Sequence, residues 1–229
     1  MIIEGVKGIV WDLDGTLIDS FGLFERVIAE VVAESGHKMP SHEFMLLNYH
    51  GSLQDTVQHI LGIDSAAELD AVVTSFLSKQ AKHYEGDMET HLFQDASMLA
   101  QRAAKEGIQQ LLITNREHAG RGPASPRFII AATVLADCIH EVFPGDEIEY
   151  KKPDKRSLGD WMERHKLAPH EVLVIGDQHL DAQLAINLGA RAMLVQRNGE
   201  IPHLSTLTEP NYADITYVDN LEEVEFANN

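Results

Sequence analysis

GIVWDLDGTL, residues Gly8–Leu17, joins an apolar segment to two acids and a glycine. The apolar run Gly8–Leu13 is typical of a buried strand, and Asp14-Gly15 is a turn signal that ends it. Asp12 and Asp14 therefore stand where a buried strand emerges from the core. A simple Asp-Gly turn explains this pair equally well on its own, so its meaning depends on the rest of the chain.

Residues 18–90 carry a helical pattern throughout. Apolar residues recur at helical spacing from Phe21 to Glu34, and Ser35-Gly36 ends that helix. No strand-like alternation interrupts the segment. Further helices are predicted at His42–Asn48, Leu53–Leu61 and Ala66–Tyr84. We therefore predict an all-helical insert at residues 18–90.

Strands and helices alternate after this insert. Asp95 is predicted to cap a helix that runs through Lys105 and ends at Gly107. The later pattern predicts strands at Gln110–Ile113, Val172–Ile175, Ala192–Val195 and Ala213–Val218, and helices at Leu158–His165 and Leu180–Leu188. Such alternation predicts an α/β fold with a doubly wound, mostly parallel sheet covered by helices. The α/β core comprises residues 1–17 and 91–229, and residues 18–90 form the inserted domain.

Polar residues follow three of the predicted strands. Asp12 and Asp14 follow the first, Thr114-Asn115-Arg116 follow the second, and Gly176-Asp177 follow the third, with Asp181 four residues further on. In an open parallel sheet, the carboxyl ends of the strands share one edge, where active sites lie. We therefore expect these side chains to meet.

Carboxylates gathered at one edge create an electrostatic problem. Asp12, Asp14 and Asp177 repel one another and destabilise the fold unless a cation compensates. Hard oxygen ligands of this kind suit Mg²⁺, which is the expected cofactor. Lys152, followed by the stiff Pro153, supplies a second cation close to the acids.

These motifs resemble the four motifs of the haloacid dehalogenase superfamily, in the same order and across nearly the whole chain. The matching stretches are Asp12–Leu17, Thr114-Asn115, Lys152-Pro153 and Gly176-Asp177 through Asp181. The helical insert resembles the α-helical cap of phosphoglycolate phosphatases and β-phosphoglucomutases. The resemblance implies a Rossmann-like core and a cap that opens and closes on hinges near residues 18–21 and 85–94.

The resemblance also implies roles for individual residues. Asp12 is expected to attack phosphorus and form an aspartyl phosphate, and Asp14 to protonate the leaving oxygen and then deprotonate the attacking water. Mg²⁺ is expected on Asp12, the backbone carbonyl of Asp14 and Asp177. Asp181 either supports the metal or serves as a hydrogen-bond acceptor within its helix. The residues expected to contact the substrate are Thr114, Asn115, Arg116 and Lys152.

The expected reaction is hydrolysis of a small-molecule phosphate monoester. One alternative is a phosphomutase of the β-phosphoglucomutase type, and a second is a non-catalytic binding protein with the same fold. Gln54 lies in the segment His50–Asp55, where the mutases carry an arginine-containing loop, and its lack of charge favours hydrolysis. Clustered acids that destabilise the fold argue against a scaffold.

Residues 117–127 depart from the family pattern. The cluster Gly120–Pro126 breaks any helix, so we predict a loop beside the active-site edge and a helix only at Phe128–Cys138. Arg116, Arg121 and Arg127 either reach a substrate anion or are solvated at the surface. Surface solvation is the favoured interpretation.

Composition limits the remaining possibilities. The 229 residues carry a formal charge of -18, which disfavours binding to nucleic acid or to an acidic membrane surface. No segment near Met1–Lys7 resembles a signal peptide, and no apolar run approaches the roughly 20 residues of a membrane-spanning helix. A single cysteine suits a reducing, cytoplasmic location. Scattered histidines without a His-Glu-x-x-His motif give no zinc site. The sequence leaves the oligomeric state open.

Overall fold

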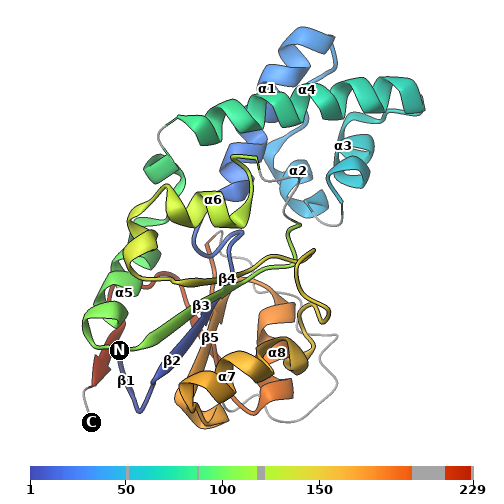
Figure 1. Ribbon diagram of the computed structural model, residues 1–229. Helices are drawn as coiled ribbons and strands as arrows, with labels where there is room; N and C mark the ends of the chain where they lie inside the picture. Colours follow the sequence, from blue (N-terminus) through green and yellow to red (C-terminus); the bar gives the residue numbers. More distant parts are fainter. Residues whose placement is uncertain (50–51, 87, 118–121, 198–214, 228–229) are drawn as a thin grey trace. The chain divides into compact units, whose positions relative to one another are not determined.

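The computed structural model describes residues 1–49, 52–86, 88–117, 122–197 and 215–227 (Figure 1). The chain divides into two compact units. The first consists of Met1–Ile18 and Leu92–Asn229, and the second of Asp19–His91. The first unit contains a parallel sheet with helices, and the second contains helices (Figure 1).

A parallel sheet forms the centre of the first unit. Among the described residues its strand order is β4-β3-β2-β5-β6-β7, and every neighbouring pair is parallel. The strands are β2 (Gly8–Trp11), β3 (Gln109–Ile113), β4 (Glu141–Phe143), β5 (Val172–Gly176), β6 (Arg191–Val195) and β7 (Ile215–Val218). The chain leaves β2 for β3 and β4, and then returns to place β5 on the other side of β2. The order therefore reverses between β2 and β5, which is where ligands bind in such sheets.

Helices cover both faces of this sheet. They are α5 (Gln94–Lys105), α7 (Gly159–His165) and α8 (His179–Leu188) (Figure 1). One face packs in a buried cluster that includes Val10, Leu111, Val174, Trp161 of α7 and Leu184 of α8. On the other face, the Gln110 amide donates to the carbonyl of Ala100 in α5 at 2.9 Å and accepts from the Trp11 indole at 2.9 Å. The predicted α/β class with a mostly parallel sheet is confirmed.

Three short strands were absent from the sequence-based expectation. β1 (Ile2–Glu4) and β8 (Glu225–Ala227) pair in parallel as a separate two-stranded sheet, and β4 lies at the edge of the main sheet. Each has only three residues, which is too short for a recognisable alternation. The strand expected at Ala213–Val218 is present as β7, and its first two residues lie outside the described ranges.

The second unit consists of helices in its described residues. They are α1 (Ser20–Ser35), α2 (His42–Asn48), α3 (Leu53–Leu61), α4 (Ala66–Glu85) and the 3₁₀-helix η1 (Met88–His91). Each α-helix begins at a side chain that accepts a backbone N–H bond from the first turn, and these caps are Asp19, Ser41, Ser52 and Ser65. Phe24 of α1 packs against Phe76 of α4, with ring centroids 5.4 Å apart. His50 and Gly51 lie outside the described residues.

The helix expected at Phe128–Cys138 is interrupted. The chain forms α6 (Pro126–Ala131) and the 3₁₀-helix η3 (Val134–Asp137) instead. The Thr133 hydroxyl donates to the carbonyls of residues 129 and 130, and such bonds compete with continuation of a helix. The helix also begins earlier than expected, because Ser125 caps it and Pro126 suits its first turn. None of the helices in the described ranges has the length and apolar character that crossing a membrane requires.

The prediction that Asp95 caps α5 was wrong. The helix begins at Gln94, and its cap residue Phe93 makes no side-chain cap bond. Asp95 is buried and accepts a bond of 2.6 Å from Arg197 and one of 2.8 Å from the Leu221 backbone N–H. Arg197 also donates to the Thr16 carbonyl at 3.2 Å. This ion pair therefore ties the loop after β2 to α5 and to the C-terminal segment.

We expect Asp95→Asn to lower the free energy of unfolding by about 2–3 kcal/mol at pH 7, because a charged hydrogen-bond partner is lost in a buried site. Burial alone raises the pKa of Asp95, but the bonds from Arg197 and Leu221 outweigh it and hold the pKa below its usual value. The ionised form therefore stabilises the fold above about pH 4, and this contribution is lost as the pH falls through the lowered pKa.

Urea denaturation at pH 7 and at pH 3–4 tests this expectation. The difference between the wild type and Asp95→Asn should be largest at pH 7 and shrink in acid. Asp70→Asn is the control, because Asp70 is exposed on α4 and its loss should change the midpoint little at either pH. A difference that does not depend on pH would contradict the assignment.

Candidate active site

Polar residues follow three neighbouring strands at the edge where the sheet order reverses. Asp12 follows β2 directly, Thr114 follows β3 and Asp177 follows β5. The Asp12 N–H donates to the carbonyl of Ile175 in β5 at 2.9 Å. The backbone of Asp12 therefore continues the hydrogen bonding between β2 and β5. Asp12 and Thr114 are 7% and 2% exposed, which shields both from bulk water.

Lys152 lies between two of the acids. Its ammonium group donates to Asp12 Oδ1 and, at 2.7 Å, to Asp181 Oδ1. The Lys152 side chain is 5% exposed, and Asp181 is 1% exposed. Asp181 Oδ2 accepts from the backbone N–H of Gln178 at 3.1 Å, at the start of α8. Asp181 therefore holds Lys152 against Asp12 and also stabilises the first turn of its own helix.

Two glycines allow the acids to approach the backbone. Gly15 has φ +76°, and a Cβ there would lie 2.2 Å from Asp177 Oδ2. A Cβ on Gly176 would lie 2.2 Å from Asp181 Oδ2. Any side chain at either position would displace a carboxylate. The Asp-Gly and Gly-Asp pairs of the sequence are therefore needed for close packing of the acids.

The amide of Asn115 fixes the loop that carries Lys152. Asn115 Nδ2 donates to the Lys152 carbonyl at 3.1 Å, and Asn115 Oδ1 accepts from the Lys152 N–H at 3.0 Å. These two bonds position the Lys152 backbone, and the expected contact of Asn115 with the substrate stays a prediction.

Arg116 forms a bidentate ion pair with Asp14. Its Nε donates to Asp14 Oδ2 at 3.0 Å, and its Nη2 donates to Asp14 Oδ1. The Asp14 carboxylate is thus held by Arg116, whereas Asp12, Asp177 and Asp181 form the acidic cluster. The expected surface solvation agrees with Arg127, which pairs with Glu147 at the exposed surface, but was wrong for Arg116, whose side chain is 19% exposed. Arg121 lies outside the described residues.

The ionisable groups of the cluster perturb one another. Burial raises the pKa of Asp12 to about 7, although the Lys152 ammonium opposes this shift. Burial, together with the charges of Asp12 and Asp181, raises the pKa of Asp177 well above its usual value. Burial alone lowers the pKa of Lys152, but the carboxylates of Asp12 and Asp181 outweigh it and raise the pKa. One ammonium therefore does not balance three carboxylates.

The cluster fits a divalent cation. One ligand atom from each of Asp12, Asp177 and Asp181 lies within 4.8 Å of the others. Asp177 Oδ1 is buried and has no hydrogen-bond partner among the described residues. A buried carboxylate oxygen without a partner is costly, and a hard cation such as Mg²⁺ would satisfy it.

The comparison with known families agrees with this geometry. The sequence model of the haloacid dehalogenase-like hydrolase family matches residues 9–195, which include every acid of the cluster. The chain belongs to this family. The predicted resemblance is confirmed, and so is the prediction of an enzyme.

Individual members of the haloacid dehalogenase-like family resemble the chain over most of its length. The phosphoglycolate phosphatase of Thiobacillus denitrificans is 28% identical over 193 residues, which cover 83% of each chain. A subfamily IA hydrolase of the superfamily from Geobacter sulfurreducens aligns with a TM-score of 0.71 and 16% identity, covering 96% of this chain and 94% of that one. CbbY from Rhodobacter sphaeroides, solved in complex with phosphate, aligns with a TM-score of 0.63 and 16% identity over 95% and 96% of the two chains.

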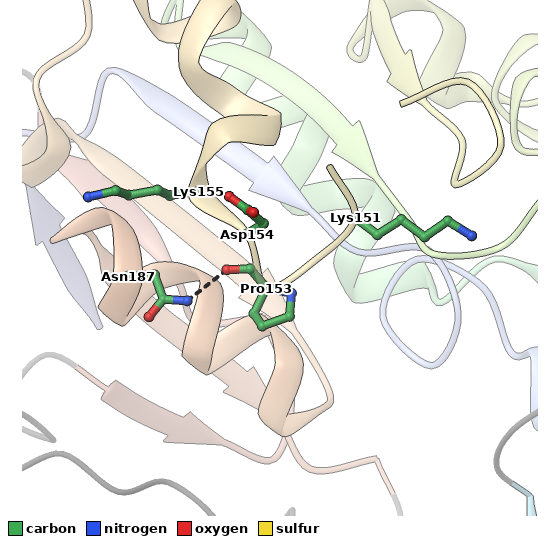
Figure 2. A pocket seen from close by; sticks show the side chains of 5 residues that line it. All are labelled: Lys151, Pro153, Asp154, Lys155 and Asn187. Carbon is green, nitrogen blue, oxygen red and sulfur yellow. Dashed lines mark hydrogen bonds between the residues drawn. The ribbon is translucent and has the colours of Figure 1, made fainter. Parts of the chain in front are cut away.

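In this haloacid dehalogenase-like enzyme, a pocket lies beside the loop that carries Lys152. Figure 2 shows the side chains that line it, which are Lys151, Pro153, Asp154, Lys155 and Asn187. The Asn187 amide donates to the Pro153 carbonyl at 2.8 Å, and the two lysines extend in different directions (Figure 2). None of the clustered acids lines this pocket. The loop that carries Lys152 is therefore held on two sides. Asn187 of α8 bonds to Pro153, and Asn115, which follows β3, bonds to the Lys152 backbone.

Proposed function

We propose that this protein is a Mg²⁺-dependent phosphatase that hydrolyses a small-molecule phosphate monoester through an aspartyl phosphate on Asp12. The observation that carries the proposal is the buried carboxylate of Asp12 at the reversal point of the sheet. Lys152 pairs with it, and Asp177, whose Oδ1 has no hydrogen-bond partner among the described residues, lies close by. A nucleophile, a fixed cation and an oxygen cluster suited to a metal are the components of phosphoryl transfer.

The reaction takes place in two steps. Asp12 forms a bond to phosphorus while the bond from phosphorus to the leaving oxygen breaks, and Asp14 gives that oxygen a proton. Water then attacks phosphorus, Asp14 takes a proton from it, and the bond to Asp12 breaks. The products are an alcohol and inorganic phosphate, and both carboxyl groups return to their initial states.

Thr114 and Lys152 are suited to hold the transferring phosphoryl group. The Thr114 hydroxyl accepts the Arg116 N–H at 3.1 Å, so its own proton is directed elsewhere and can be donated to a phosphoryl oxygen. Lys152 neutralises charge on the oxygens as it already does on Asp12. Asp181 and Asn115 act indirectly, because they position Lys152.

Mg²⁺ would be held by Asp12, Asp177 and the backbone carbonyl of Asp14. When bound, it neutralises negative charge on the phosphoryl oxygens and lowers the repulsion between that group and the acids. This contribution matters for a chain of charge -18, which otherwise repels anionic esters.

Hydrolysis is favoured over the mutase reaction by the relatives. The phosphoglycolate phosphatase of Thiobacillus denitrificans resembles the chain over 83% of its length. 2-Phosphoglycolate is therefore the first ester to test, within a panel of small phosphate monoesters.

We expect phosphate release from at least one ester of this panel in the presence of Mg²⁺, and loss of that release when EDTA removes the metal. A colorimetric phosphate assay measures both. Conversion of a sugar phosphate to its isomer without free phosphate would favour the mutase. Absence of turnover across the panel would favour a binding protein.

A further inference from the structure

Arg116 holds the carboxylate that is proposed to exchange protons with the substrate. The guanidinium contacts both oxygens of Asp14 through two neighbouring N–H groups. Such a bidentate pair fixes the plane of the carboxylate as well as its position. The two side chains are 19% and 26% exposed, so the pair lies at the border of the site and not on the open surface.

Arg116 is itself fixed at several points. Its N–H donates to Thr114 Oγ1, and its carbonyl accepts from the Gly145 N–H at 2.8 Å. Its Nη1 donates to the Ala124 carbonyl at 3.2 Å. Ala124, in the segment 122–125 directly before α6, therefore supplies a backbone acceptor that supports the guanidinium.

We propose that Arg116 is a positioning residue that acts through Asp14, and that it orients the carboxyl group towards the leaving oxygen. This inference rests on the proposed function. A protonated Asp14 keeps one oxygen that accepts from the guanidinium, so it stays in contact with Arg116 through one of the two bonds. The earlier expectation that Arg116 binds the substrate gives a different result in the experiment below.

Leaving groups of different acidity separate these roles. Phenolate is a poor leaving group and needs a proton, whereas 4-nitrophenolate leaves readily without one. A residue that orients the acid therefore matters for phenyl phosphate and matters little for 4-nitrophenyl phosphate. A residue that binds the phosphoryl group affects both esters equally.

We expect Arg116→Met to lower kcat/KM for phenyl phosphate about 10²-fold, the cost of a misplaced catalytic group, and for 4-nitrophenyl phosphate less than about 5-fold. Arg116→Lys keeps the charge but not the bidentate contact, so we expect an intermediate loss of about 10-fold for phenyl phosphate. Competitive inhibition by inorganic phosphate should be the same in all three proteins. Arg127→Met is the matched control and should resemble the wild type with both esters.

A double variant tests whether Arg116 acts through Asp14. Arg116→Met added to Asp14→Asn should lower kcat/KM for phenyl phosphate less than about 2-fold further, because the residue it positions is already gone. Equal losses for both esters, weaker inhibition by phosphate, or losses that multiply in the double variant would each overturn the inference while the proposed function stands. A wild type that hydrolyses neither of these esters nor any other ester of the panel would overturn the proposed function and the inference with it.

Discussion

Asp12→Asn is expected to lower Mg²⁺-dependent phosphate release by about 10⁴-fold or more, which is the scale seen when a catalytic nucleophile is removed. The amide has nearly the shape of the carboxylate but is a poor nucleophile, and it does not form a stable phosphorylated intermediate. The variant should still fold, because an amide oxygen continues to accept the Lys152 bond. Phosphate release and thermal unfolding measure the two expectations separately.

Mass spectrometry of protein quenched during turnover adds a direct test of the nucleophile. The wild type should carry a phosphoryl group on the peptide that contains Asp12, and Asp12→Asn should carry none. Asp160→Asn, an exposed change in the first turn of α7, is the control and should resemble the wild type. Phosphate release at the wild-type rate by Asp12→Asn would identify another group as the nucleophile.

Local patterns in the sequence were sufficient for the strands and helices that position this site. Gly8–Trp11 is a continuous apolar run that forms β2, and the helices at His42–Asn48 and Leu53–Leu61 begin where predicted because serines cap them. The edge at which Asp12 and Asp177 meet followed from a general property of parallel sheets. These features depend on near neighbours in the chain or on topology alone.

The partners of the charged side chains could not be predicted in the same way. Asp14 and Arg116 are 102 positions apart, as are Asp95 and Arg197. Nothing in either neighbourhood distinguishes a solvated arginine from one that holds a buried or half-buried acid. Aspartate is a residue type that often caps helices, and only the bond from the distant Arg197 explains why Asp95 does not cap α5.

Lys152→Met is expected to have a second large effect, on stability as well as on activity. Without the ammonium group, Asp12 and Asp181 lose their shared partner in a buried site, and we expect the free energy of unfolding of the metal-free protein to fall by about 3–5 kcal/mol. Phosphate release should fall by about 10²–10³-fold, because one fixed donor to the transferring group is lost. Lys151→Met is the matched control, since Lys151 is exposed and pairs with Glu117 at the surface.

The response to Mg²⁺ then distinguishes a metal site from a cluster that Lys152 alone compensates. Acids that have lost the ammonium group should bind a divalent cation more tightly. A ligand that binds only the folded state raises its stability by an amount that grows with the logarithm of that affinity. Thermal unfolding should therefore show a larger Mg²⁺-dependent rise in Tm for Lys152→Met than for the wild type or Lys151→Met. Equal rises in all three proteins would place the cation away from Asp12 and Asp181, which are the acids that lose the Lys152 ammonium group. No rise in any of them would mean that the folded protein does not bind Mg²⁺.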